Sequence, residues 1–176
     1  YCHGYEVRDQ PLGVLGGSDD AVRYAHLVRQ WTHDLVLFAQ EHPLADEQRS
    51  HLAARGIRVI EGPLRRLVID DDRLTGVEMA DDRIVNRAAL FVPPRFVPND
   101  DLLVCLGCRR DEGGWVPTDR TGYTGVPGLW AAGNVVNPRA QVITAAGEGS
   151  AAAIAINADL VDEDIRDASR DRRPIG

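Results

Sequence analysis

The chain has 176 residues, of which 44% are hydrophobic and 27% charged, with a formal net charge of −7. This length and composition suffice for one hydrophobic core or two small ones, and no apolar run reaches the length of a membrane span. The negative charge argues against nucleic acid or an anionic membrane as the main partner, because phosphate binding needs a basic surface. Three cysteines are too few for a disulfide-stapled secreted fold, which favours a reducing cytoplasm.

Strands and helices are predicted to alternate along residues 11–62. Short apolar runs bounded by glycine or polar residues predict strands, and amphipathic stretches that begin at polar residues predict helices. The predicted order is strand 11–17, helix 21–31, strand 34–39, helix 46–56 and strand 57–62. This alternation is typical of a parallel, doubly wound α/β sheet, so a Rossmann-like domain is expected.

The pattern changes after residue 63. Three short alternating stretches predict an antiparallel meander laid onto the parallel sheet, which gives a three-layer domain. These stretches are residues 64–70, 73–80 and 83–92. A proline-rich segment over 92–98 predicts a crossover or linker. Beyond it we expect a helical turn over 99–107, a buried strand over 128–133 and a long helix over 141–161.

A glycine turn between the first strand and the first helix is a candidate dinucleotide site. Gly16 and Gly17 close the strand, and Gly16 fits the turn glycine that brings backbone N–H groups and the helix dipole to a pyrophosphate. Ala21 fits the small residue that packs helix on sheet, but Ser18 replaces the middle glycine. Asp19 adds negative charge where a phosphate would sit. A nucleotide site and a strand–helix turn without a ligand therefore both remain open.

The end of the second strand is expected to select the nucleotide, because a residue there meets the adenosine ribose. Glu41 follows this strand. Its carboxylate can accept from a ribose 2′-hydroxyl but would repel a 2′-phosphate, and no pair of arginines stands there to hold NADP. NADH, NADPH and no nucleotide at all therefore remain open, beside the interpretation of Glu41 as part of a solvated loop.

A second glycine turn precedes the long helix, in the segment "GVPGLWAAGNVVNPRAQVITAAGEGSAAA" at residues 125–153. This segment resembles the C-terminal flavin motif of the thioredoxin reductase-like, FAD-dependent pyridine nucleotide–disulfide oxidoreductases. The resemblance implies that Gly133 lies beside the flavin ribityl chain and that Asn134, in place of the usual Asp, hydrogen-bonds a ribityl hydroxyl. It places Gln141 and Val142 at the flavin pyrimidine edge, where the helix N-terminus would stabilise negative charge on the reduced ring.

The first residues carry the same resemblance. Family members begin the pyridine-nucleotide domain with Cys-x-x-Cys, an acidic residue and Gly-Phe/Tyr, and "CHGY" resembles the second half of that motif. The resemblance implies that Cys2 is the flavin-facing cysteine and that its partner lies upstream of Tyr1. His3 replaces the Asp of many thioredoxin reductases, and resembles the His of the family's small-molecule dithiol oxidases. A neighbouring imidazole can take a thiol proton and favour the reactive thiolate. The alternative is a Cys-His pair with no catalytic role.

The resemblance also implies a domain organisation. We expect a pyridine-nucleotide-type domain over residues 1–92, the C-terminal segment of a split FAD-binding domain over 93–165 and a flexible tail over 166–176. The first flavin-binding segment is missing from this pattern, so we expect the chain to be a fragment that is inactive and binds FAD poorly by itself. A homodimer is expected from the resemblance alone.

Three functions follow from these motifs. The first passes electrons between a nicotinamide cofactor, FAD and a cysteine pair that includes Cys2, acting on a protein or small-molecule disulfide. The second is a small-molecule dithiol oxidase that uses O₂ and no nicotinamide, and the third is a non-catalytic flavin- or nucleotide-binding module. Cys105 and Cys108 have the spacing of a redox pair or of half a zinc site. Because no second Cys or His pair follows, we predict two structural thiols and no metal.

Overall fold

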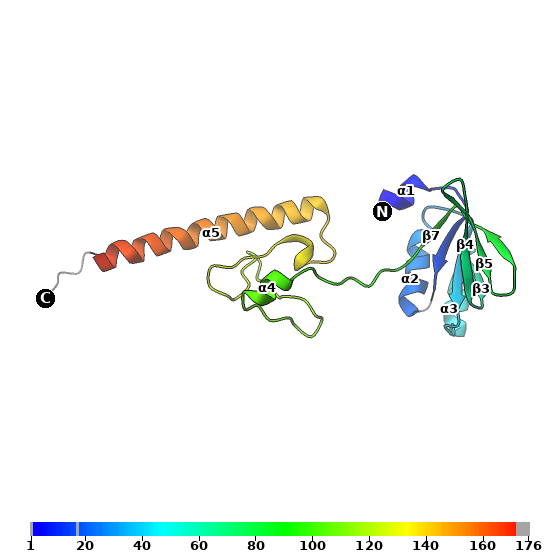
Figure 1. The fold of residues 1–176 in the computed structure, drawn as a ribbon, viewed down its shortest axis with the longest axis horizontal. Coiled ribbons are helices and arrows are strands. Elements are labelled where there is room, and N and C mark those ends of the chain that lie inside the picture. The colour runs from blue at the N-terminus through cyan, green and yellow to red at the C-terminus, as the bar shows by residue number, and fades with distance from the viewer. Residues whose placement is uncertain (1, 17, 172–176) are drawn as a thin grey trace. The chain divides into compact units, whose positions relative to one another are not determined.

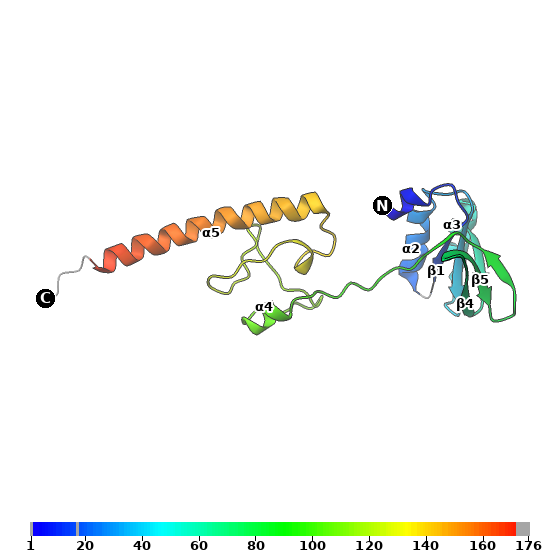
Figure 2. The same cartoon turned by 45° about the horizontal axis from the view of Figure 1, so that its top comes forward.

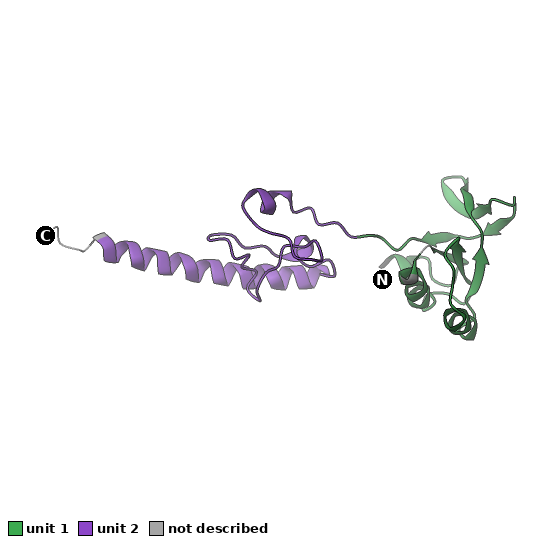
Figure 3. Cartoon of the chain, turned by 90° about the horizontal axis from the view of Figure 1, so that it is seen from below, with its two compact units in different colours: residues 1–95 green, residues 96–176 purple. Residues whose placement is uncertain are grey.

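The computed structural model describes residues 2–16 and 18–171, and the chain divides into two compact units (Figure 3). The first unit is Tyr1–Arg95 and the second is Phe96–Gly176. The boundary lies inside the predicted linker, where three prolines disfavour both helix and central strand. Among the described residues, no helix is long and apolar enough to cross a membrane.

The first unit contains the predicted alternation of strands and helices (Figure 1). Its elements are α1 (Cys2–Glu6), β1 (Leu12–Leu15), α2 (Asp19–Val28), β2 (Leu35–Gln40), α3 (Asp46–Ala54) and β3 (Arg58–Glu61). A later strand, β7 (Ala89–Phe91), completes a four-stranded sheet in the order β3-β2-β1-β7, with all neighbours parallel. The predicted Rossmann-like α/β architecture is confirmed, and the reversal of strand order at β1 places a crevice at its carboxyl end.

The antiparallel meander lies over one face of this sheet. It consists of β4 (Leu64–Asp70), β5 (Arg73–Met79) and β6 (Ile84–Asn86). We expected residues 83–92 to belong to it throughout, and this was wrong for the second half, which forms β7. The chain leaves the meander at Arg87, whose buried guanidinium donates to the carbonyl oxygens of Leu12 and Asp34. Ala88 then donates its N–H to Pro11 and starts the pairing with β1.

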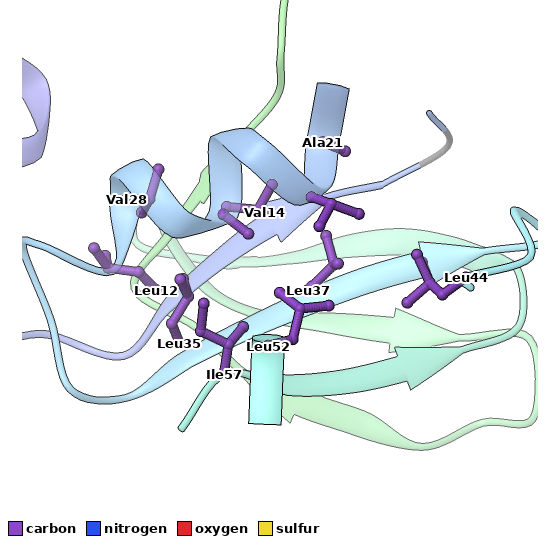
Figure 4. Packing of buried hydrophobic residues seen from close by; sticks show 12 residues of the cluster. Leu12, Val14, Ala21, Val28, Leu35, Leu37, Leu44, Leu52 and Ile57 are labelled. Atoms are coloured by element: carbon purple, nitrogen blue, oxygen red, sulfur yellow. The ribbon is translucent and has the colours of Figure 1, made fainter. Parts of the chain in front are cut away.

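The parallel sheet has a core on each face because successive side chains of a strand point to opposite sides. Leu12, Leu35 and Leu37 face α2 and α3, as Figure 4 shows. Val36 and Phe38, which alternate with them on β2, pack instead against β5 of the meander. The two helices and the meander thus form the outer layers, with the sheet between them.

The second unit consists of loops and helices. It contains α4 (Asp101–Cys105), the 3₁₀ turn η1 (Gly133–Val135) and the 30-residue helix α5 (Val142–Asp171). The long helix predicted over 141–161 is present and longer. Residues 166–171, predicted to belong to a flexible tail, are helical, and residues 172–176 lie outside the described part.

The predicted strand over 128–133 does not form. Among the described residues of this segment, only Trp130 makes a β-bridge, to Tyr123. The apolar run has the composition of a buried strand, but a strand needs a hydrogen-bonding neighbour along its length. Figure 2 shows the C-terminal part of α5, coloured orange to red, running free of the loops of its own unit.

Candidate functional site

The helix α1 carries the predicted catalytic residues and is attached to the first unit through Trp31. Gly4 packs on the indole so closely that a Cβ there would lie 2.5 Å from Trp31 Nε1. The Tyr5 ring stands edge-on to the same indole, with ring centroids 6.3 Å apart. The backbone of Cys2 belongs to α1, while its side chain lies outside what the structure describes. The turn that bears Cys2 is therefore fixed on the folded unit.

His3 lies exposed on α1, and its Nδ1 is 3.1 Å from Glu6 Oε2. The side chains of His3 and Glu6 are 89% and 67% exposed, respectively. The imidazole is therefore open to exchange protons with a neighbouring group. Glu6 is a residue that our sequence interpretation missed, although its position three residues after His3 in a helical turn was a usable signal.

The first glycine turn lies at the carboxyl end of β1. The Gly16 N–H donates to the Phe38 carbonyl at 2.6 Å, and a Cβ at Gly16 would lie 2.5 Å from that oxygen. Gly16 is therefore required by the close approach of β1 and β2, whatever the turn binds. Gly17 lies outside the described residues. Ala21 is 1% exposed and packs in the core, as its small size predicted.

Ser18 caps α2 by its extended backbone, with φ −160° and ψ 163°, but its hydroxyl makes no capping hydrogen bond. Asp19 is the first residue of α2, and its side chain is not described. Asp20 beside it is exposed. The described part of this turn therefore leads into the N-terminus of α2, where the acidic residues bring negative rather than positive charge.

Glu41 lies exposed just after β2, at the same edge of the sheet. The last residue of β2, Gln40, pairs with Glu61 of β3. Arg49 of α3 forms an ion pair with Glu61 and so neutralises that carboxylate. This edge does not fit a 2′-phosphate, because an exposed carboxylate would repel it.

The second glycine turn is held by Glu148 of α5. Gly133 has a positive φ of 76°, which favours glycine, and its N–H donates to Glu148 Oε2 at 2.8 Å. Asn137 Nδ2 donates to the other carboxylate oxygen at 2.7 Å. Glu148 thus ties the turn to the helix. Sequence interpretation missed Glu148 because it acts over 15 residues of chain.

The residue in place of the usual Asp has a local role. The amide of Asn134 donates to the carbonyl oxygens of Asn137 and Ala140, each at 3.2 Å. An ionised Asp could make neither bond because it has no donor. The Asn134 carbonyl oxygen can still accept from a hydroxyl, so this residue fits the predicted ribityl contact.

Gln141 and Val142 are exposed where α5 begins, and Val142 is 89% exposed. The Ala145 N–H donates to Gln141 within the helix, so the N–H groups of the preceding helical residues have no intrahelical acceptor. Such free donors and the helix dipole stabilise negative charge. This donor set fits the electron-rich edge of a reduced flavin, and the structure brings Gly133, Asn134, Gln141 and Val142 together at one end of α5.

Two hollows border α5 within the second unit. One has a volume of about 230 Å³ and is lined in part by Glu148 and Asp119, and a more open one of about 590 Å³ is lined by Asp119, Tyr123 and Trp130. The Thr121 hydroxyl and nearby backbone N–H groups donate to Asp119 and hold the pKa of its carboxyl below the usual value. The smaller hollow therefore carries the carboxylates of Asp119 and Glu148 beside Arg120.

Cys105 and Cys108 have different environments. Cys108 is 6% exposed and packs with Leu103 and Val116, while Cys105 is exposed at the end of α4. Cys108 donates its N–H to Leu103, across Gly107 with φ +99°, in the Schellman arrangement that ends many helices. Cys108 therefore has a packing role. Among the described residues, no three His, Cys, Asp or Glu side chains gather where they could hold a metal ion.

Comparison with known proteins identifies the family of this chain. The family model described as pyridine nucleotide-disulphide oxidoreductase matches residues 3–149. The chain is 31% identical to a thioredoxin reductase from Mycolicibacterium smegmatis, over 93% of this chain and 55% of that protein. The crystal structure of HlmI is 59% identical, with a TM-score of 0.90, over 97% of this chain and 54% of that one. An oxidoreductase from Agrobacterium tumefaciens is 30% identical, with a TM-score of 0.79, over 90% and 54% of the two chains.

The chain spans about half the length of these relatives. Its fold, its two glycine turns and the family match over most of its length agree with one another. The chain belongs to the pyridine nucleotide-disulphide oxidoreductase family and is similar to its thioredoxin reductases.

Proposed function

We propose that this chain is the C-terminal part of a flavin-dependent oxidoreductase that interconverts a dithiol and a disulfide. The observation that carries the proposal is the Cys2-His3 pair on α1, a helix held against a Rossmann-like unit through Trp31. A thiol exchanges with a disulfide only as its thiolate. The exposed imidazole of His3 is next in sequence to Cys2 and can take the thiol proton. Cys2 then acts with a second cysteine upstream.

FAD fits the turn at the start of α5. Gly133, Asn134, Gln141 and Val142 would hold it, with Asn134 accepting from a ribityl hydroxyl and the helix N-terminus facing the pyrimidine edge. When bound, FAD supplies the acceptor or donor of two electrons that a dithiol–disulfide conversion requires. Glu148 keeps Gly133 in place and acts as a support for this site.

A dithiol oxidase that uses no nicotinamide is the second candidate, and the charge at the carboxyl edge of the sheet favours it. Asp20 and Glu41 are exposed there, and Ser18 replaces the glycine that allows close approach of a pyrophosphate. In this reaction a dithiol and O₂ would give a disulfide and H₂O₂. The first candidate, a reductase, would draw its electrons from NADH or NADPH and act on a protein or small-molecule disulfide.

Two further properties complete the proposal. We expect a homodimer, as the resemblance implies, and a reducing compartment such as the cytoplasm, as the low cysteine content favours. Sedimentation of the purified protein tests the first expectation directly.

The test uses the longest natural polypeptide that contains this sequence, purified and kept anaerobic. Its flavin absorbance is followed while NADPH, NADH and dithiothreitol are added in separate titrations, with Cys2→Ser as the control. Bleaching by a nicotinamide supports the reductase, and bleaching by dithiothreitol alone, with recovery in air, supports the oxidase. If no flavin is bound, or none of the three reductants bleaches it, the non-catalytic binding module takes the place of both.

A further inference from the structure

His3 and Glu6 form a pair whose atoms define the protonation pattern of the imidazole. The contact joins His3 Nδ1 to Glu6 Oε2 at 3.1 Å. An ionised carboxylate only accepts hydrogen bonds, so the hydrogen in this contact must sit on Nδ1. A neutral imidazole carries one N–H, which leaves the lone pair on Nε2. The pair therefore favours one tautomer of His3 over the other.

The helix α1 gives this pair a fixed frame. Gly4, between the two residues, is buried against Trp31, and Tyr5 contacts the same indole. Arg8 lies over the Tyr5 ring at 4.1 Å and donates to the Tyr5 carbonyl oxygen. The contacts with Trp31 and with Arg8 thus fix the helical turn that carries His3 and Glu6. The side-chain contact between these two residues, three positions apart, can therefore persist.

We propose that Glu6 is a positioning residue that holds His3 as the Nδ1–H tautomer, so that Nε2 accepts the thiol proton of Cys2. The inference rests on the proposed function of Cys2. In this step the S–H bond of Cys2 breaks and an N–H bond forms at Nε2, and no electrons are transferred. The products are a thiolate and an imidazolium, and the Glu6 carboxylate then faces the positive ring. A carboxylate that orients a catalytic histidine in this way fixes both the tautomer and the ring position.

The exposure of the pair indicates that it contributes little to the stability of the fold. Exposed ion pairs contribute on average little to folding, because solvent screens them and ordering two side chains costs entropy. Glu6→Ala is therefore expected to fold normally. A second exposed pair, Glu47 and His51 on α3, gives a matched control, with Glu47 Oε1 4.0 Å from His51 Nε2 and no proposed role in the reaction.

The experiment compares Glu6→Ala, Glu6→Gln and Glu47→Gln in the full-length flavoprotein. The first readout is the anaerobic rate of flavin reduction by dithiothreitol. We expect Glu6→Ala to slow it about 10-fold or more, the lower end of the effect seen when a metal-bound histidine loses its orienting partner. Glu6→Gln should recover most of the rate because its amide oxygen also accepts from Nδ1–H, and Glu47→Gln should not change it.

The second readout is the ¹⁵N–¹H spectrum of the His3 ring, which distinguishes the two tautomers. The wild type is expected to show the Nδ1–H form, and Glu6→Ala to shift toward the Nε2–H form. Equal rates and an unchanged tautomer in Glu6→Ala would overturn the role of Glu6. If dithiothreitol fails to reduce even the wild-type flavin, the exchange of Cys2 with a small dithiol fails instead, and the ring spectrum still decides whether Glu6 sets the tautomer.

Discussion

Different kinds of contact stabilise each of the two units of this chain. The first has a sheet with a core on both faces, and Leu12, Leu35 and Phe38 are completely buried in it. The second has a core cluster of four buried residues, Leu103, Cys108, Val116 and Ala131, beside a helix of 30 residues. A layered α/β unit buries enough apolar area to fold by its own contacts, whereas a small cluster contributes much less.

In the second unit, polar contacts compensate in part for the small apolar core. Arg110 makes a two-pronged ion pair with the fully buried carboxylate of Asp100, at 2.9 and 2.7 Å. The Arg110 guanidinium holds the pKa of that carboxyl below its ordinary value. Glu148 fastens the turn at Gly133 to α5 by accepting hydrogen bonds from Gly133 and Asn137. Directional bonds of this kind set the shape of the loops, where apolar burial is limited.

The helix α5 shows the difference most clearly. Seven small or apolar residues recur along it at intervals of three and four, and all of them are exposed. This stripe comprises Ile143, Gly147, Ser150, Ile154, Ala158, Val161 and Ile165. Such spacing places them on one face of the helix. On α2 in the first unit, by contrast, the apolar face is covered, and Ala21, Ala25 and Val28 are all buried.

The largest effect is expected from Phe38→Ala in the first unit. Phe38 is fully buried between the sheet and the meander, so the change removes apolar contacts and leaves a cavity. A loss of about 3–5 kcal/mol in the free energy of unfolding is expected, measured by urea denaturation. A loss below about 1 kcal/mol would mean that the two faces of the sheet do not form one cooperative core.

Gly16→Ala is expected to destabilise the first unit by about 1–3 kcal/mol, because the added methyl group meets backbone atoms that cannot move aside easily. The new Cβ would lie 2.5 Å from the Phe38 oxygen and 2.8 Å from the Ala39 Cα. Gly56→Ala is not a suitable control because φ is positive there. Gly147→Ala in α5, where a Cβ meets nothing within 4 Å, is the matched control and should stabilise the helix slightly.

Low pH should lower the free energy of unfolding of the first unit, because Asp34 becomes protonated. Partial burial raises the pKa of its carboxyl, but hydrogen bonds from Arg87 and Arg58 outweigh this and hold the pKa below its ordinary value. Because the folded pKa lies below the unfolded value of about 3.9, the stabilisation is complete above that pH and is lost as the pH falls through the folded pKa.

Asp34→Asn should therefore cost stability at neutral pH and flatten its decline below about pH 4. The Asp34 side chain is 48% exposed, so screening limits the effect to about 1 kcal/mol or less. Urea denaturation across this pH range measures it, with Asp72→Asn in the exposed turn between β4 and β5 as the control. An equal decline in wild type and Asp34→Asn would contradict the role of the ion pairs.

The smallest effect is expected from Ile154→Ala on the exposed stripe. Ile154 is 71% exposed, so the unfolding free energy should change by no more than about 0.5 kcal/mol. Leu103→Ala in the same unit, at 8% exposure, should cost more, by about 2 kcal/mol or above. A loss of more than about 1 kcal/mol in Ile154→Ala would show that the stripe is covered in solution, and sedimentation would show whether a second copy covers it.

The local pattern of residues predicted much of the first unit. Apolar runs such as Leu35–Gln40 and the glycine at position 16 mark β2 and its turn, and both lie where the pattern indicated. The start of α5, after the turn at Gly133 and Asn134, also lies where the pattern indicated. These features depend on neighbours in the chain, since propensity, alternation and turn chemistry act over a few residues.

Other features depended on contacts between distant segments. Ala89–Phe91 continue the alternation of the meander, yet they join β1 because Arg87 anchors the chain beneath that strand. Glu148 reaches Gly133 only after α5 turns back over the loop.

Residues 128–133 have the composition of a strand, but pairing with a neighbour decides whether a strand forms. The sequence by itself determined most of the succession of helices, strands and turns in the first unit, because those signals are local. Tertiary structure alone decided which strands pair, which carboxylates hold the turns and which faces stay exposed, because each of these requires two parts of the chain to meet.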